Sequence, residues 1–162
     1  MNIAILTVSD TRSLEQDVSG SLLVERARNS GHCVQEHVLV RDEKEEIREC
    51  LKRWINDAKI QVIISTGGTG LTARDITVDV HKEFYEKIIE GFSTVFHMVS
   101  YEKIGVSTIQ SRVCAGVASG KLLFALPGSP SACRDAWDEI LRYQLDAGFL
   151  PCNLAEIIDR LT

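Results

Sequence analysis

The stretch that decides the fold of this chain reads Gln61-Val-Ile-Ile-Ser-Thr-Gly-Gly-Thr-Gly-Leu-Thr-Ala-Arg-Asp-Ile-Thr-Val-Asp79. It opens with an apolar run rich in β-branched residues, which is typical of a strand buried on both faces. Gly67, Gly68 and Gly70 then permit positive φ angles and close approach of a ligand to the backbone. A glycine-rich loop at the carboxyl end of a buried strand is suited to hold an anion with main-chain N–H groups. The alternative is a tight connection that binds nothing.

Strands and helices alternate on both sides of this stretch. The predicted strands cover residues 3–8, 32–40, 62–64, 113–118 and 122–126. The predicted helices cover residues 19–29, 43–58, 77–85, 91–101, 131–144 and 153–161. Ser119-Gly120-Lys121 separates the last two strands and predicts a hairpin. This order predicts an α/β fold, a three-layer α/β/α sandwich with a mostly parallel mixed sheet, in a single domain over residues 1–162.

The same pattern predicts helix caps and one apolar helix face. Ser19 or Ser21 is a candidate cap for the first helix, and Thr77 for the third. In the fourth helix, Phe92 and Phe96 belong to an apolar set at helical spacing, which is typical of core or subunit contacts.

Composition and charge narrow the function classes. The chain has 162 residues and a net charge of −5, and this acidic balance argues against binding to a nucleic-acid backbone. No apolar run approaches the ~20 residues that a membrane span requires, and no leader peptide is visible at the N-terminus. The five cysteines include no C-x-x-C pair, and the histidines show no zinc-ligand spacing. We expect a soluble, cytoplasmic protein with reduced thiols and no membrane or nucleic-acid partner.

Polar clusters follow four of the predicted strands. They are Ser9-Asp10 (continuing to Arg12), Asp42, the loop from Thr66 to Asp75, and Pro127-Gly-Ser-Pro130. Parallel strands place their carboxyl ends at one edge of a sheet, and ligands of α/β proteins bind there. These clusters therefore predict one shared site.

The glycine loop meets one of two common phosphate-binding patterns. The Walker pattern fails because no lysine follows the glycines. The dinucleotide pattern is met by Gly68, Gly70 and Ala73, with Glu90 about 20 residues further on. Because these glycines follow a mid-chain strand, a NAD-binding enzyme is the weaker alternative.

Two carboxylates beside the glycines favour a different chemistry. Asp42 and Asp75 lie at or just beyond predicted strand ends, and Mg²⁺ binds one or two carboxylates together with substrate phosphate oxygens. Phosphoryl and nucleotidyl transfer depend on this positioning and charge neutralisation. The alternatives are a helix cap for Asp42, a salt bridge or turn cap for Asp75, and a turn cap for Asp10. Arg74 is placed to contact a phosphate.

Two motifs resemble the signatures of one family. Thr66-Gly-Gly-Thr-Gly70, with Arg74-Asp-Ile-Thr77 and Asp79, is similar to the first signature of the MoaB/Mog molybdopterin-binding family of molybdenum cofactor biosynthesis. Leu126-Pro-Gly-Ser-Pro130 is similar to the second. Ser9-Asp10, Asp42-Glu43 and Ser111-Arg112 also fall where members have similar residues. The segments that resemble the B-type branch more than the Mog branch are 90–92, 100–102, 104–105 and 107–112.

The resemblance implies an α/β/α fold and a homotrimer or homohexamer that binds molybdopterin. In active members, the terminal phosphate of molybdopterin is joined to AMP from Mg-ATP and pyrophosphate is released. Asp42 and Asp75 would be the catalytic residues and Mg²⁺ ligands. The residues that would bind substrate are Ser9, Asp10, Thr66, Gly67, Gly68, Thr69, Gly70, Arg74, Ser111, Arg112, Pro127, Gly128, Ser129 and Pro130. The alternative is a non-catalytic, molybdopterin-binding oligomer that stores or hands over the pterin.

Overall fold

A computed structural model describes residues 1–11 and 13–161, so Arg12 lies outside the described residues. One six-stranded sheet has the order β2-β1-β3-β6-β5-β4. Its strands are β1 (Asn2–Val8), β2 (Cys33–Val40), β3 (Val62–Thr66), β4 (Lys87–Ile88), β5 (Cys114–Ala118) and β6 (Lys121–Leu126). Strands β2, β1, β3 and β6 are parallel, whereas β5 and β4 run antiparallel to their neighbours. The sheet is therefore mixed and mostly parallel, as predicted.

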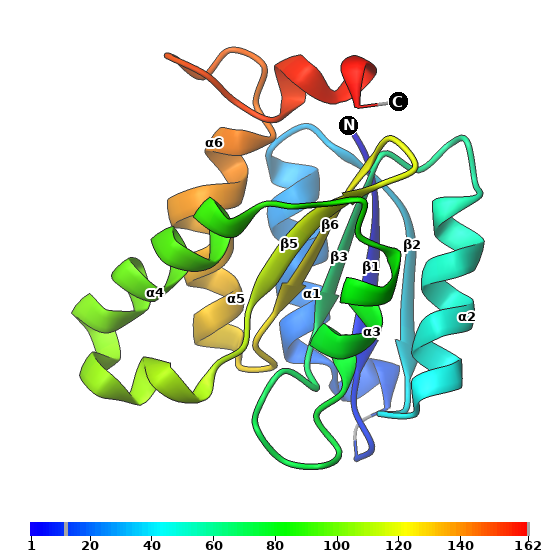
Figure 1. The fold of residues 1–162 in the computed structure, drawn as a ribbon, viewed down its shortest axis with the longest axis vertical. Coiled ribbons are helices and arrows are strands. Elements are labelled where there is room, and N and C mark those ends of the chain that lie inside the picture. Colours follow the sequence, from blue (N-terminus) through cyan, green and yellow to red (C-terminus); the bar gives the residue numbers. More distant parts are fainter. Residues whose placement is uncertain (12, 162) are drawn as a thin grey trace.

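Helices cover both faces of this sheet (Figure 1). They are α1 (Val18–Asn29), α2 (Lys44–Ile55), α3 (Thr77–Phe84), α4 (Glu90–Ile104), α5 (Pro130–Ala136) and α6 (Arg142–Gln144). A π-helical segment, Trp137–Leu141, joins α5 to α6, and 3₁₀ turns cover Leu14–Gln16, Gly105–Gln110 and Ala155–Arg160. The predicted terminal helix is thus a 3₁₀ turn over most of its length.

Alternation along β1 divides the core between two layers. Ile3 and Ile5 pack in one apolar cluster with residues of α1, α4 and α5. Leu6 and Val8 pack in a second cluster with residues of α2 and α3. Because successive side chains of a strand point to opposite faces, β1 holds both outer layers to the sheet. The three-layer α/β/α prediction is confirmed.

The predicted caps of the first three helices are wrong. The cap of α1 is Asp17, whose carboxylate accepts the Gly20 N–H at 2.9 Å, so Ser19 lies inside the helix. Asp42 precedes Glu43, the N-cap residue of α2, and its carboxylate accepts from the Ile76 N–H instead. Thr77 is the first residue of α3 and does not cap it.

The hairpin prediction is confirmed, but one strand was missed. Ser119 and Gly120 adopt φ angles of 48° and 75°, the left-handed turn conformation that suits a two-residue connection. Strand β4 was missed because it has only two residues and no alternation that a sequence could reveal. It extends the sheet by pairing Lys87 with Val117 and Ile88 with Gly116.

Helix α4 has two apolar sides with different surroundings. Phe92 and Phe96 are buried in the first core cluster, and Phe92 packs edge-on against Phe124. The other side is exposed and continues into the following 3₁₀ turn. We call it the α4 apolar face: Val95, Met98, Tyr101, Ile104, Val106 and Ile109. Figure 1 shows α4 standing away from the body of the sheet.

None of the described helices has the length and hydropathy that crossing a bilayer would require.

Candidate functional site

The carboxyl ends of the four parallel strands meet at one edge of the sheet, at the lower end of Figure 1. Gly67 is the point of closest approach. Its φ is +96°, and a Cβ atom built on it would lie 2.2 Å from the Val8 carbonyl oxygen. A Cβ built on Gly128 would lie 3.1 Å from Gly67 Cα. Only glycine allows the ends of β1, β3 and β6 to approach this closely. The predicted convergence of the polar clusters is confirmed.

A cavity of about 340 Å³ lies at this junction. Its lining consists of Thr7, Val8, Ser9, Thr11, Ser19, Thr66, Gly67, Gly68, Gly128 and Ser129. Six of these were predicted as substrate-binding residues. Thr7, Val8, Thr11 and Ser19 were missed, and Ser19 could have been found because the helix after a parallel strand begins at the same edge. No basic side chain is among the described lining residues, so an anion here would be held by hydroxyls and main-chain N–H groups.

Two buried hydroxyls fix the turn that closes this cavity. Ser19 Oγ donates to the Gly128 carbonyl at 2.8 Å, and Thr66 Oγ1 donates to the Pro127 carbonyl at 2.8 Å. Ser129 caps α5 by accepting the Ala132 N–H at 3.2 Å. Pro130 occupies the first position of α5, where its missing N–H costs nothing. Pro127 and Pro130 therefore shape the turn from outside the cavity lining.

Asp42 lies on the other side of the glycine loop. A Cβ built on Gly68 would lie 2.8 and 2.9 Å from the Asp42 carboxylate oxygens and 2.4 Å from Thr77 Oγ1. The Asp42 residue is 8% exposed, and its buried Oδ1 has no hydrogen-bond partner among the described residues. Burial, together with the charges of Asp75 and Asp10, raises the pKa of Asp42. An ionised oxygen without a partner in such a place favours binding of a cation.

Asp75 lies against the next glycine of the loop. A Cβ built on Gly70 would lie 2.8 Å from Asp75 Oδ2, which accepts hydrogen bonds from Thr72 N at 2.9 Å and Thr72 Oγ1 at 2.6 Å. Burial raises the pKa of Asp75, but the Thr72 hydrogen bonds outweigh it, and the pKa is lowered overall. The turn-cap alternative describes the Asp75 contacts seen here, and these contacts keep the carboxylate ionised.

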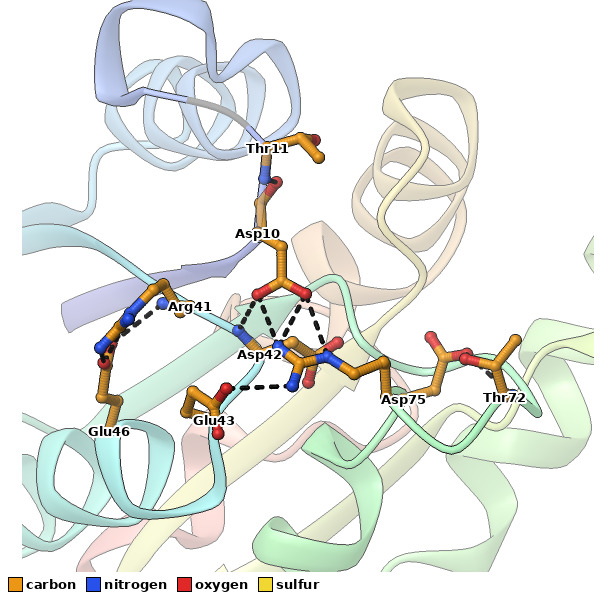
Figure 2. A network of polar contacts seen from close by, with 10 residues as sticks. Asp10, Thr11, Arg41, Asp42, Glu43, Glu46, Thr72 and Asp75 are labelled. Atoms are coloured by element: carbon orange, nitrogen blue, oxygen red, sulfur yellow. Dashed lines mark hydrogen bonds and ion pairs between the residues drawn. The ribbon is translucent and has the colours of Figure 1, made fainter.

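An ion-pair cluster crosses the edge of the sheet between these aspartates (Figure 2). Arg74 Nη2 pairs with Asp10 Oδ2 at 2.8 Å, and Arg74 Nη1 pairs with Glu43 Oε1 at 3.0 Å. Asp10 Oδ1 also accepts the Asp42 N–H at 3.0 Å. The pKa of Asp10 is lowered, chiefly by its hydrogen bond with Arg74. Arg74, which was predicted to contact a phosphate, is here occupied by two carboxylates.

Arg112 braces the glycine loop from the side of β5. Its Nε donates to the Gly70 carbonyl at 2.7 Å, and Nη2 donates to the Asp75 carbonyl. Its main-chain N–H donates to the Thr69 carbonyl at 3.0 Å, and Nη1 pairs with Asp79 at 3.0 Å. Arg112 therefore positions the loop that carries Asp75, and its guanidinium is directed at protein carbonyls.

Ser111 contributes its backbone to the same region. Its carbonyl lies 3.0 Å from His97 Nε2, and its N–H donates to the Thr108 carbonyl. The cavity lining does not include Ser111. Its predicted role in substrate binding stays a prediction, as do the roles of the other assigned residues.

The described residues fit a divalent cation only in part. Asp42 offers an unpartnered carboxylate oxygen, and Thr77 Oγ1 is a second buried oxygen without a partner among the described residues. No group of three or more His, Cys, Asp or Glu side chains within residues 1–11 and 13–161 is arranged to hold a metal ion. A cation here would need substrate oxygens to complete its ligand set, which is the usual arrangement for Mg²⁺.

A second hollow, of about 350 Å³, lies between α4 and the C-terminal segments. It is lined mainly by apolar side chains, among them Phe92, Val95 and Phe124. None of the residues assigned to substrate or metal lines it. The polar junction at the strand ends is therefore the candidate site.

Comparison with known proteins agrees with this geometry. The sequence pattern of the probable molybdopterin binding domain matches residues 4–147. Molybdenum cofactor biosynthesis protein B of Escherichia coli (strain K12) is 46% identical over 151 residues, which cover 93% of this chain and 89% of that protein. The corresponding protein of Bacillus cereus is 38% identical over 142 residues, covering 87% of this chain and 84% of that protein.

Solved structures agree as well. A crystal structure of molybdenum cofactor biosynthesis protein B has a TM-score of 0.89 and 34% identity, and covers 99% of this chain and 94% of its own. The tungsten cofactor synthesizing protein MoaB from Pyrococcus furiosus has a TM-score of 0.78 and 32% identity, over 86% of this chain and 89% of its own. From the signatures, the fold and these relatives, the chain belongs to the molybdopterin-binding family of molybdenum cofactor biosynthesis.

Proposed function

We propose that this protein binds molybdopterin in the cavity at the strand ends and adenylylates its phosphate with Mg-ATP, releasing pyrophosphate. The observation that carries the proposal is the glycine loop at the carboxyl edge. Gly67 faces the cavity, while Gly68 and Gly70 each pack against a candidate aspartate. One loop thus joins an anion cradle to two carboxylates.

Each part of the cavity has a role in this reaction. The N–H groups of the loop and the hydroxyl of Ser9 would hold the pterin phosphate, while the Ser19 and Thr66 hydroxyls, which donate to the Gly128 and Pro127 carbonyls, would fix the shape of the cavity. An oxygen of that phosphate attacks the α-phosphorus of ATP, and the bond from the α-phosphorus to the oxygen bridging to the β-phosphorus breaks, so pyrophosphate leaves. Asp42 and Asp75 would hold Mg²⁺, which neutralises charge on the phosphates when bound. The aspartates position this charge close to the loop without entering the pterin cavity.

The second candidate is a non-catalytic molybdopterin-binding oligomer. The contacts of Thr72 with Asp75 and of Arg74 with Asp10 and Glu43 favour it, because these groups are occupied by protein partners. The NAD-binding alternative has little support from the geometry. Glu90 begins α4 beside β4, and β6 and β5 separate β4 from β3 in the sheet.

Pyrophosphate release decides between the first two functions. Purified protein is mixed with molybdopterin, ATP and Mg²⁺, and pyrophosphate is measured over time. The adenylylation proposal expects release that requires molybdopterin. Tight molybdopterin binding without pyrophosphate would overturn it and leave the storage function.

Asp75→Asn sharpens this test. The substitution keeps the shape of the side chain and its acceptor for Thr72 but removes the charge. We expect turnover to fall on the order of 100-fold, as for loss of one preorganised electrostatic group, with the fold near native stability. Asp79→Asn is the matched control, since Asp79 pairs with Arg112 at the surface. Unchanged turnover in Asp75→Asn would remove Asp75 from its assigned role.

We also infer that the protein assembles as a homotrimer or homohexamer and that α4 contributes to the subunit contact. Phe92 and Phe96 are committed to the core. The α4 apolar face is the surface available for this contact, since exposed apolar groups in one continuous region favour association.

A further inference from the structure

Arg74 occupies a central position among the acidic groups of the candidate site. Its guanidinium contacts Asp10 with two nitrogens, Nε at 3.2 Å and Nη2 at 2.8 Å, and contacts Glu43 with Nη1 at 3.0 Å. The three residues come from different segments: the end of β1, the start of α2 and the loop after β3. Arg74 therefore joins three segments of the chain through its ion pairs with Asp10 and Glu43, which Figure 2 labels.

The ion pairs of Arg74 with Asp10 and Glu43 are weak enough to break. All three side chains are exposed, with 54% of the Arg74 side chain and 39% of the Asp10 side chain accessible. Ion pairs at such exposed positions contribute little to stability, because water solvates both charges when they separate. A phosphate is a good competitor for this guanidinium, since arginine forms paired hydrogen bonds with phosphate oxygens as readily as with a carboxylate.

Breaking the ion pairs of Arg74 would change the electrostatic environment of Asp42. Asp10 already contacts the Asp42 backbone through the 3.0 Å hydrogen bond, and both Asp10 and Asp75 lie near enough to raise the pKa of Asp42. Asp42 Oδ1 is buried and unpartnered among the described residues. While Arg74 is in place, its positive charge opposes a cation at this point. Once Arg74 turns to an anion, Asp10 and Asp42 remain with uncompensated negative charge.

We propose that Arg74 couples anion binding to divalent-cation binding: an anionic ligand takes the Arg74 guanidinium from Asp10, and the released Asp10 joins Asp42 in attracting a divalent cation. This inference rests on the proposed function, because it links the binding of phosphate to the binding of Mg²⁺ at the same site. The coupling is reciprocal, so the cation also strengthens anion binding. Arg74 acts here as a positioning residue that works through Asp10.

The test measures cation affinity without any turnover. Mn²⁺ replaces Mg²⁺ as a paramagnetic probe, and free Mn²⁺ is followed by electron paramagnetic resonance in titrations of the full chain. Sulfate serves as the anion, compared with chloride at equal ionic strength. In the unmodified protein, sulfate should tighten Mn²⁺ binding by about two- to fivefold, the size expected for releasing an exposed ion pair.

Two variants test whether the sulfate effect on Mn²⁺ binding depends on Arg74 and Asp10. Arg74→Met should bind Mn²⁺ more tightly than the unmodified protein in chloride, and sulfate should add nothing further. Asp10→Asn should lose the sulfate effect while Mn²⁺ binding stays weak. Arg48→Met is the matched control: Arg48 also pairs with two carboxylates, Glu45 and Glu83, but on the surface of α2 and α3, and its response to sulfate should equal that of the unmodified protein.

Two results would overturn the inference. One is an equal sulfate effect in Arg74→Met and the unmodified protein; the other is unchanged or weaker Mn²⁺ binding in Arg74→Met. Far-ultraviolet circular dichroism verifies that each variant is folded. Failure here is separable from failure of the proposed function, because pyrophosphate release can occur without this coupling and the coupling can occur without pyrophosphate release.

Discussion

At the residue scale, two aspartates of the same site are held in opposite electrostatic states. Asp42 is buried beside like charges, with one oxygen unpartnered among the described residues, and its pKa is raised. Asp75 receives two hydrogen bonds from Thr72, and its pKa is lowered. Ionised Asp42 is therefore less favourable in the folded protein than in the unfolded chain, as is common for groups at functional sites.

Stability should reveal this difference through its pH dependence. A raised pKa means that the folded protein binds the Asp42 proton more tightly than the unfolded chain, so ionisation of Asp42 lowers stability as pH rises through that pKa. Asp42→Asn should therefore stabilise the protein at pH 7 by about 1 kcal/mol, or about 2–4 °C in Tm. The gain should shrink as pH falls through the raised pKa. Differential scanning calorimetry between pH 7 and pH 4 measures it.

Asp75→Asn provides the matched comparison. The lowered pKa means that ionised Asp75 adds stability at neutral pH, and this contribution is lost only as pH falls through the folded-state pKa. Asp75→Asn should thus lower Tm slightly at pH 7, opposite in sign to Asp42→Asn. The same sign for both variants at pH 7 would contradict the assigned states.

At the element scale, sequence patterns predicted every strand except β4 and most helices, but not the helix caps. The β-branched run before the glycines and the spacing of apolar residues in α2 identify these elements, because burial alone determines them. The cap predictions were wrong because several polar side chains near each helix start could serve as the cap. Tertiary contacts determine which of them does. Asp42 turns to Ile76, a residue far along the chain, and no local pattern contains that information.

Part of the candidate site was likewise predictable from the sequence, and part was not. Convergence of the glycine loop with the turn at Gly128 was predictable, because parallel strands fix it. The pairing of Arg74 with Asp10 and Glu43 was not predictable, because it depends on the relative positions of three segments that are distant in the sequence. Ser19 was missed as a cavity residue because the sequence suggested it as the cap of α1. The cap is Asp17, two residues earlier.

A substitution at Gly67 tests whether the ends of β1, β3 and β6 approach as closely as the structure shows. Gly67→Ala should destabilise the protein by about 1–3 kcal/mol, because alanine disfavours a φ of +96° and its Cβ would meet the Val8 carbonyl at 2.2 Å. Urea unfolding measures the loss. Gly91→Ala in α4 is the control, since nothing lies within 4 Å of the added Cβ, and it should gain about 0.5–1 kcal/mol. A Gly67→Ala variant of unchanged stability would show that the strand ends are farther apart.

At the scale of the whole molecule, six of the exposed large apolar residues belong to α4 and the 3₁₀ turn that follows it. The α4 apolar face continues through the 3₁₀ turn Gly105–Gln110, and Arg112 follows that turn by two residues. Arg112 in turn holds the carbonyls of Gly70 and Asp75. The surface proposed for subunit contact is thus joined by a short, well-bonded segment to the loop of the candidate site.

Sedimentation tests that surface. The unmodified protein should sediment as a trimer or hexamer at micromolar concentration, and Ile109→Glu should shift it toward monomer, because a charge at an apolar contact is costly to bury. Ile109 is 73% exposed in the single chain. Leu150→Glu is the matched control: Leu150 is 79% exposed but lies outside the α4 apolar face, so its assembly should be unchanged. A monomeric unmodified protein would contradict the assembly.

Two consecutive glycines of the loop have different neighbours: a Cβ added to Gly67 would meet Val8, whereas a Cβ added to Gly68 would meet Asp42 and Thr77. The loop backbone therefore lies between the cavity and the Asp42 carboxylate, and Gly68 borders both. Under the proposed function, molybdopterin would enter the cavity and Mg-ATP would bind on the Asp42 side of the loop. The loop would then select each substrate separately, and the two phosphates would react only when both substrates are bound.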